Sequence, residues 1–344
     1  MGIAFKEIII SKEISLEELK GKILVVDSYN LLYQFLTTIR AADGTLLADS
    51  KGNVTSHLVG LFSRTTKLME CGIRLAFVFD GTPPALKQKE RERRRELKIE
   101  AQEEYKKAAE MQDIEAMKKY ASRTSRLTEN MIEESKKLVL AMGAPIVQAP
   151  SEGEAQAAYI VKKGGAFSTV SQDFDGLING STRLIRNLSI VGKRKMANKL
   201  AYETVEPEII SLDDNLKNLG INIGQLICLA MLVGTDYNTG GIKGIGPKNA
   251  LKLVRKHGDN FDALFKEAQW NAQFDFPWAD VFNTIKDMPV TDDYTLEWKA
   301  PDAEKLMKFL VDEHDFSIER VESSLKRLTE EKAKNQQKGL SEFF

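Results

Sequence analysis

The sequence predicts an α/β protein whose central sheet is mostly parallel and is flanked by helices. Three short apolar runs each end in an aspartate, at residues 22–27, 75–80 and 166–173. The first run is followed by a helical pattern of apolar residues over 31–39. Because strands that alternate with helices form βαβ units, we expect the three runs to be strands of one parallel sheet. Ligands of such sheets bind beyond the carboxyl ends of the strands, where all three aspartates would lie.

The segments outside the sheet are predicted mainly from composition. Residues 86–137 are rich in charged residues, Ala and Met and contain no Gly or Pro, which favours helix. Since this segment lacks a strong apolar face, we expect a helical arm that projects from the core. Helices and loops dominate after Glu206, and residues 332–344 indicate a flexible tail with apolar residues at its tip.

The charge is almost balanced overall but unevenly distributed. The formal net charge is −1 over 344 residues, so the total charge predicts no particular partner. Seven basic residues and three glutamates lie between positions 87 and 98, while residues 237–258 hold five basic residues and no acid. Basic patches beside an acidic cluster suit a polyanion that is held near metal ions.

Cysteine usage and hydropathy indicate an intracellular protein. Cys71 and Cys228 show neither metal-site spacing nor a disulfide framework, which fits a reducing compartment. No apolar run approaches about 20 residues, so we expect no membrane span. The start of the chain lacks a secretory signal, and Lys6 stands where a myristoylation signal requires Ser or Thr. A cytoplasmic protein without a membrane anchor is expected.

Acidic residues that stand at the ends of apolar elements are the main functional signal. Asp173 and Asp175 follow a strand and would point to the same side in extended chain. Taken singly, some of these acids have simpler explanations: Ser151 and Glu154 match a helix capping box, and Asp236 matches an ordinary turn residue. Taken together, seven carboxylates would share one cleft: Asp27, Asp80, Glu152, Glu154, Asp173, Asp175 and Asp236.

Such a cluster requires cations. Seven unneutralised carboxylates in one cleft would repel each other by several kcal/mol in total, even at an effective dielectric constant of about 20. Oxygen ligands without Cys or His select hard ions, Mg²⁺ or Mn²⁺. Two such ions about 4 Å apart are the usual apparatus of phosphodiester cleavage. The sequence therefore predicts a metal-dependent nuclease.

Several motifs in a fixed order resemble the structure-specific flap endonucleases of the Rad2 type, in their archaeal form. They include DSYNLLYQFL, VFDGTPPALK, APSEGEAQAA, SQDFDGL and GTDYNTGGIKGIGPKNAL, and the match runs essentially end to end. The resemblance implies a PIN-like 5′ nuclease core, a helical arch and a helix–hairpin–helix element. It further implies that all seven carboxylates are ligands, direct or through water, of two Mg²⁺ ions, for which Mn²⁺ would substitute.

The same resemblance implies an activity and a division of the chain. The activity is endonucleolytic cleavage of 5′ flaps in branched DNA, with 5′–3′ exonuclease activity, in Okazaki-fragment maturation and DNA repair. A single nuclease domain is expected over 1–336, followed by a clamp-binding tail at 337–344. Within that domain we expect an N-terminal part of the core, the arch, an internal part of the core with the hairpin at 238–258, and a C-terminal helical region: 1–85, 86–137, 138–258 and 259–330.

Two basic residues of the arch are implied to reach the scissile phosphate. Lys87 and Arg94 are seven residues apart, which places them on one helix face two turns apart. The alternative is a solvated, charged helix surface, and this remains our interpretation of Lys89, Arg91 and Lys98.

Further residues match DNA-contacting positions of the family. Tyr33 matches an aromatic residue that stacks on a base near the cut, and its alternative is core packing beside Phe35. The segment GIKGIGPKNALKLVRK resembles a helix–hairpin–helix, in which glycines let phosphates approach the backbone and the next helix offers free N–H groups. A simple turn between helices is the alternative, and a K⁺ ion is implied at the hairpin. The expected DNA contacts are Tyr33, Arg40, Arg64, Glu152, Gly234, Asp236, Lys243, Gly244, Gly246, Lys248 and Lys252.

The last residues match Q-x-x-L-x-x-F-F, the binding box for a PCNA-type sliding clamp. Leu340, Phe343 and Phe344 would share one face of a helical turn, and Gln337 completes the box. Apolar side chains on a solvated tail require a pocket, either on a clamp or, alternatively, on the chain's own domain. The chain stops at this box, which favours an archaeal source. We expect the protein to be a monomer associated with the nucleoid.

Three other functions remain open. One is a 5′ exonuclease or excision-repair nuclease of the same superfamily, although repair enzymes carry a longer insertion than residues 86–137 allow. A second is a non-catalytic junction-binding or clamp-loading accessory protein, which would tolerate missing acids, yet none is missing. A third is a PIN-type ribonuclease, which would need neither the hairpin nor the clamp tail.

Overall fold

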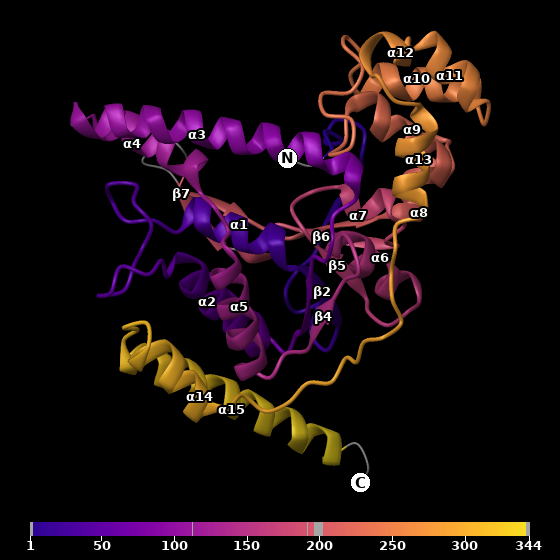
Figure 1. The fold of residues 1–344 in the computed structure, drawn as a ribbon. Coiled ribbons are helices and arrows are strands. Elements are labelled where there is room, and N and C mark those ends of the chain that lie inside the picture. The colour runs from indigo at the N-terminus through magenta and orange to yellow at the C-terminus, as the bar shows by residue number, and fades with distance from the viewer. Residues whose placement is uncertain (1–2, 112, 191, 196–201, 342–344) are drawn as a thin grey trace.

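A seven-stranded sheet forms the centre of the molecule (Figure 1). The computed structural model describes residues 3–111, 113–190, 192–195 and 202–341. The strand order is β1-β9-β6-β5-β2-β3-β4, in which the strands from β6 to β4 run parallel and β9 pairs antiparallel with both β6 and β1. The predicted α/β class with a mostly parallel sheet is confirmed. The strands of this sheet are β1 (Lys12–Glu13), β2 (Ile23–Asp27), β3 (Arg74–Phe79), β4 (Ile146–Gln148), β5 (Ser168–Val170), β6 (Arg183–Arg186) and β9 (Glu208–Ser211).

Helices cover both faces of the sheet, and β7 (Gly192–Lys195) and β8 (Tyr202–Val205) form a separate two-stranded antiparallel sheet. The helices are α1 (Ser28–Thr38), α2 (Ser56–Glu70), α3 (Gln88–Glu110), α4 (Ile114–Ala121), α5 (Glu129–Ala141), α6 (Gly153–Lys162), α7 (Asp175–Ile178), α8 (Leu212–Leu219), α9 (Ile223–Val233), α10 (Pro247–His257), α11 (Phe261–Glu267), α12 (Trp270–Gln273), α13 (Trp278–Lys286), α14 (Ala303–Met307) and α15 (Ile318–Ser341).

The strand residues alternate between two apolar layers. Leu24 and Val26 of β2 pack in a layer with residues of α1, α2 and α5, whereas Val25 packs in a layer with residues of α6. Successive side chains of a strand point to opposite faces, so a strand that is covered on both faces must be apolar throughout. This explains the unbroken apolar runs, and it leaves only the strand ends for polar residues.

The arch is built from α3 and α4, which pack against each other and lie along one side of the core (Figure 1). The predicted arm, however, ends earlier than residue 137. Residues from Glu129 belong to α5, in which Met131 and Leu138 are buried at a spacing of two helical turns. This apolar stripe packs α5 in the core, and the high charge of the preceding residues had concealed it.

The described part of the predicted C-terminal tail, residues 332–341, is helical. Helix α15 continues to Ser341, so the backbone of Gln337 and Leu340 is helical, whereas Phe343 and Phe344 lie outside the described residues.

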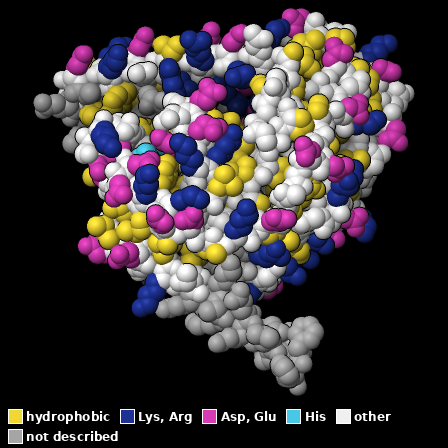
Figure 2. Space-filling view, turned by 60° about the horizontal axis from the view of Figure 1, so that its bottom comes forward, with side chains coloured by type: hydrophobic (Ala, Val, Ile, Leu, Met, Phe, Trp, Pro, Cys, Tyr) yellow, Lys and Arg dark blue, Asp and Glu magenta, His cyan; other side chains and the backbone are white. Residues whose placement is uncertain are grey.

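Within the described part of the chain, no single helix is long and apolar enough to span a membrane, although α8 and α9, bent by 78°, pass that test together. On the face shown in Figure 2, acidic and basic side chains are intermixed.

Candidate metal and phosphate site

The ends of β2 and β3 bring two carboxylates to one edge of the sheet. Asp27 is the last residue of β2, pairs with Val78 in the sheet, and accepts a hydrogen bond from the Asn30 N–H at 3.1 Å at the start of α1. Asp80 follows β3 and accepts a hydrogen bond from the Gly153 N–H at 2.8 Å. A Cβ on Gly153 would stand 2.6 Å from Asp80 Oδ1, so this approach requires glycine.

Helix α6 contributes Glu152 and Glu154, but the predicted capping box is wrong. The N-cap residue is Glu152, and no side chain caps the helix locally. The Ser151 hydroxyl instead donates a hydrogen bond to the Thr82 carbonyl at 2.9 Å. The carboxylate of Asp80 accepts from the first N–H of the helix in its place. The cap thus comes from another segment, and neither glutamate side chain caps the helix.

Asp173 and Asp175 follow β5 in a turn and not in extended chain as predicted. The strand ends at Val170, residues 172–174 bend, and Asp175 is the first residue of α7. The Asn30 side chain donates a hydrogen bond to Asp173 at 2.8 Å, which links this turn to α1. The seventh carboxylate, Asp236, lies in the loop that follows α9.

Burial and mutual repulsion act on these carboxylates together. Burial, and then the nearby Asp173, raise the pKa of Asp27 to about 6. Burial, and then Asp27 and Glu152, raise the pKa of Asp80 to about 7. The pKa values of Glu154 and Asp175 are also raised well above their ordinary values, first by burial and then by neighbouring carboxylates that include Asp236. The structure therefore brings all seven predicted acids into one electrostatic cluster.

Lys87 and Arg94 lie against this carboxylate cluster. Lys87 Nζ is 2.5 Å from Glu152 Oε2 and 3.2 Å from Asp236 Oδ2, and Arg94 donates a hydrogen bond to Asp236. Burial acts to lower the pKa of Lys87, but Glu154 and the other acids raise it overall. In the described residues no three His, Cys, Asp or Glu side chains are arranged to hold one ion in this structure.

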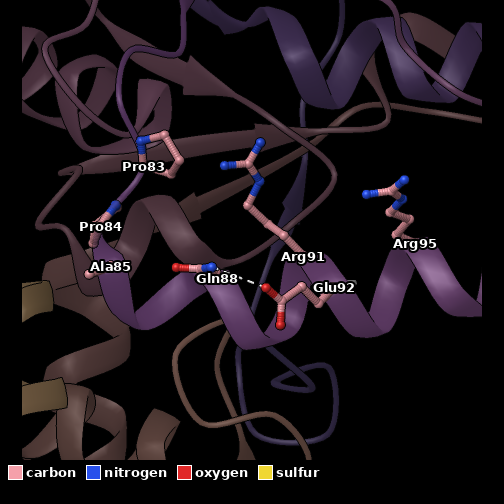
Figure 3. A pocket seen from close by; sticks show the side chains of 7 residues that line it. All are labelled: Pro83, Pro84, Ala85, Gln88, Arg91, Glu92 and Arg95. Atoms are coloured by element: carbon pink, nitrogen blue, oxygen red, sulfur yellow. Dashed lines mark hydrogen bonds between the residues drawn. The ribbon is translucent and has the colours of Figure 1, made fainter.

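A cavity beside the arch lies apart from the cluster. It has a volume of about 460 Å³ and lies where the turn before α3 meets the helix. Figure 3 shows Arg91 and Arg95 pointing to the same side of α3, while Gln88 and Glu92 are joined by a hydrogen bond of 3.0 Å. None of the seven carboxylates lines this cavity, whose walls are formed by Pro83, Pro84, Ala85, Gln88, Arg91, Glu92 and Arg95.

The predicted helix–hairpin–helix consists of α9, a glycine-rich loop and α10, and the two helices pack together. Gly234 ends α9, and Gly246 is the N-cap of α10 without any side-chain cap. Pro247 at the first position has no N–H, so the N–H groups left without a side-chain cap are those of the residues that follow it. Gly244 has φ of +82°, which glycine adopts without strain, and no atom lies within 4 Å of a Cβ placed there. The loop leaves room for a phosphate. The hairpin lysines Lys243, Lys248 and Lys252 are exposed.

The other predicted DNA contacts differ in their surroundings. Tyr33 is 37% exposed while Phe35 is buried, so Tyr33 does not pack in the core; the Lys98 ammonium stands 4.9 Å from its ring centre. Arg64 is exposed. Arg40, in contrast, is half-buried and donates hydrogen bonds to the Gly44 carbonyl at 2.8 Å and to Ser125 at 2.5 Å. Arg40 therefore joins α1 to the base of the arch.

Two functional neighbours were not predicted from the sequence. Asn30 links the turn at Asp173 to α1, and Glu90 accepts hydrogen bonds from Arg94 and from Thr239. The signal for Asn30 was its position three residues after the first strand-end aspartate. The signal for Glu90 was an acid four residues before Arg94 within a basic run, which favours an ion pair on a helix.

Comparisons with known proteins show the family of the chain. The family models of the XPG N-terminal domain and the XPG I-region match residues 1–101 and 143–236. Flap endonuclease 1 of Pyrococcus abyssi is 51% identical over 344 residues, covering 100% of this chain and 98% of that protein. The structure of flap endonuclease-1 from Methanococcus jannaschii is 43% identical, with a TM-score of 0.76 over 97% of this chain and 100% of that one. The catalytic core of Rad2 in complex with DNA substrate is 26% identical, with a TM-score of 0.70 over 95% of this chain and 100% of that one. The chain therefore belongs to the flap endonuclease 1 family of metal-dependent nucleases.

Proposed function

We propose that the chain cleaves 5′ flaps in branched DNA by phosphodiester hydrolysis with two Mg²⁺ ions, for which Mn²⁺ substitutes. The observation that carries this proposal is the cluster of seven carboxylates at the strand ends, whose pKa values rise through burial and mutual repulsion. The donor set consists only of oxygen, and the cluster already draws two arch cations into contact, so it fits hard divalent ions. Bound there, two such ions supply a nucleophile at neutral pH and stabilise the leaving oxygen.

The side chains of the chain divide the remaining work. The seven acids hold the ions, directly or through water, and Asn30 and Gly153 fix the orientation of Asp173 and Asp80. Lys87 and Arg94, which lie against the cluster in this structure, turn to the scissile phosphate and stabilise the negative charge that develops there. Tyr33 stacks on a base beside the cut once Lys98 leaves its ring.

Duplex DNA binds at the hairpin through its backbone and not through its sequence. The uncapped start of α10, the open space at Gly244 and the hairpin lysines favour a phosphate contact, to which a K⁺ ion adds. Rad2, a relative of known structure, has been seen in complex with DNA substrate. Arg64 is exposed and available for DNA. Arg40, in contrast, supports the base of the arch through its hydrogen bond to Ser125.

The C-terminal residues 337–344 bind a PCNA-type sliding clamp, and the nuclease itself is a cytoplasmic, nucleoid-associated monomer. The proposed clamp binding is supported by the Q-x-x-L-x-x-F-F pattern alone. Clamp binding would bring the enzyme to replication and repair sites, where 5′ flaps arise.

One experiment tests the main proposal. Labelled 5′-flap, 3′-flap, duplex and single-stranded DNA are incubated with the protein in Mg²⁺ or in excess EDTA. We expect cleavage of the 5′ flap near its junction in Mg²⁺ only. Equal cleavage of the four substrates would contradict flap specificity, cleavage in EDTA would contradict the metal mechanism, and binding without cleavage would favour an accessory protein.

A further inference from the structure

Glu90 is a buried carboxylate that the reaction described above does not use. It lies in the first turn of α3, and its side chain is 4% exposed. Arg93 donates two hydrogen bonds to it, at 2.7 and 2.9 Å, and Arg94 Nε donates one at 2.5 Å. The Thr239 hydroxyl donates a fourth at 2.7 Å. These donors hold the pKa of Glu90 at about 2 although burial acts to raise it, so this carboxylate is ionised.

These contacts close a ring between the arch and the loop that follows α9. The guanidinium of Arg94 uses one nitrogen for Glu90 and another for Asp236. Asp236 and Thr239 belong to the same loop, and Thr239 returns to Glu90 from a position 149 residues away in the sequence. The start of α3 is therefore fixed to the segment that leads from the carboxylate cluster to the hairpin.

A simpler role for Glu90 does not explain this arrangement. An acid in the first turn of a helix complements the helix dipole, and such a side chain serves equally well in water. Glu92, two residues further on, is exposed and bonds only to the neighbouring Gln88 among the described residues. Glu90, in contrast, is buried and accepts hydrogen bonds both from α3 and from the loop that follows α9.

We propose that Glu90 is a positioning residue for Arg94. It fixes the guanidinium toward the carboxylate cluster and, through Thr239, makes this orientation depend on the loop that enters the DNA-binding hairpin. The proposal rests on the proposed function, in which Arg94 acts on the scissile phosphate. A freely rotating arginine would meet the transition state in few of its conformations, and a buried charge-assisted contact restricts it.

The test is a double-mutant cycle measured in single turnovers on a 5′-flap substrate with saturating Mg²⁺. We expect Glu90→Ala to lower the cleavage rate by about ten- to a hundredfold, while the Kd for the flap in EDTA changes less than about threefold. Glu90→Gln, which keeps an acceptor for Thr239, should recover part of the rate. In an Arg94→Ala background, Glu90→Ala should cause no further loss. Glu92→Gln is the matched control and should cleave at the wild-type rate.

Thr239→Val gives a second, milder perturbation that leaves every charge of the arch in place. It should slow cleavage by a few-fold, again only when Arg94 is present, and thermal unfolding of each variant verifies folding. If Glu90→Ala and Thr239→Val both cleave at the wild-type rate while Arg94→Ala is slow, the inference fails and the proposed function stands. A loss that multiplies with that of Arg94→Ala also overturns it. If Arg94→Ala cleaves normally, the proposed role of Arg94 fails as well.

Discussion

Replacing Lys87 with alanine separates catalysis from charge on the arch surface. Lys87 is 16% exposed and lies between Glu152 and Asp236, at 2.5 and 3.2 Å. Its position beside the carboxylates suits a cation that stabilises the negative charge that develops on the scissile phosphate in the transition state. Removing a preorganised group of this kind costs roughly a hundredfold in rate or more, which corresponds to about 2.7 kcal/mol at the transition state. Little change in flap affinity is expected because the group acts mainly in the transition state.

Lys89 offers a matched control on the same helix. Its ammonium pairs with Asp275 at 3.0 Å, and both side chains are 76% exposed. Exposed pairs of this kind contribute about 0–1 kcal/mol, and Lys89 does not contact the carboxylate cluster among its described partners. Lys89→Ala should therefore cleave at nearly the wild-type rate.

The assay is rapid-quench cleavage of a 5′ flap in single turnovers with saturating Mg²⁺, combined with anisotropy measurements of flap binding in EDTA. If Lys87→Ala and Lys89→Ala lose the same small factor, the arch presents only a solvated basic surface. If Lys87→Ala loses rate and affinity in equal proportion, Lys87 binds the substrate and does not act in catalysis.

Four other outcomes are expected. Asp80→Ala should abolish cleavage in gel assays while flap binding persists, and full activity would show that Asp80 is not a ligand. Changing the hairpin lysines together to alanine should reduce the slope of log Kd against log salt by about one per lost phosphate contact, and an unchanged slope would place the DNA elsewhere. Deleting residues 337–344 should remove calorimetric binding to a cognate clamp and leave cleavage of free flaps intact, whereas undiminished affinity would locate the contact elsewhere in the chain. Asp27 and Asp80 have pKa values of about 6 and 7 in the fold against 3.8 ordinarily. Stability from their protonated forms is complete below about pH 4 and is lost as pH rises through 6 and 7. The Tm in EDTA should therefore fall over that window, Mg²⁺ should raise it more at about pH 8 than at pH 5, and a Tm in EDTA that rises instead would contradict this linkage.

The sheet and its acids could be predicted from sequence because both follow from local rules. A strand covered on both faces is apolar throughout, so an acid such as Asp27 or Asp80 marks the point where it leaves the core. Parallel strands end on one edge, and the acids therefore converge without any knowledge of side-chain geometry.

The errors arose where a distant segment decides the local structure. Ser151 and Glu154 match a capping box, but the helix is capped by Asp80, which lies 73 residues from Gly153 in sequence. The pattern of Asp173 and Asp175 fits a strand equally well, yet Asn30 holds the first of them in a turn. Arginine is usually a surface residue, but Arg40 is half-buried and donates a hydrogen bond to Ser125. No local pattern contains these partners.

On the proposed mechanism, the same basic residues would serve as counter-ions in two different situations. In this structure Lys87 and Arg94 lie against the carboxylate cluster, in ion pairs with Glu152 and Asp236. Divalent ions bound by the cluster would take over this neutralisation, because a doubly charged ion among several carboxylates gains more Coulomb energy than a single ammonium. The arch cations would then be free to meet the phosphate, the next strongest negative charge beside them. On the proposed mechanism, metal binding by the cluster would thus release the arch cations for the substrate.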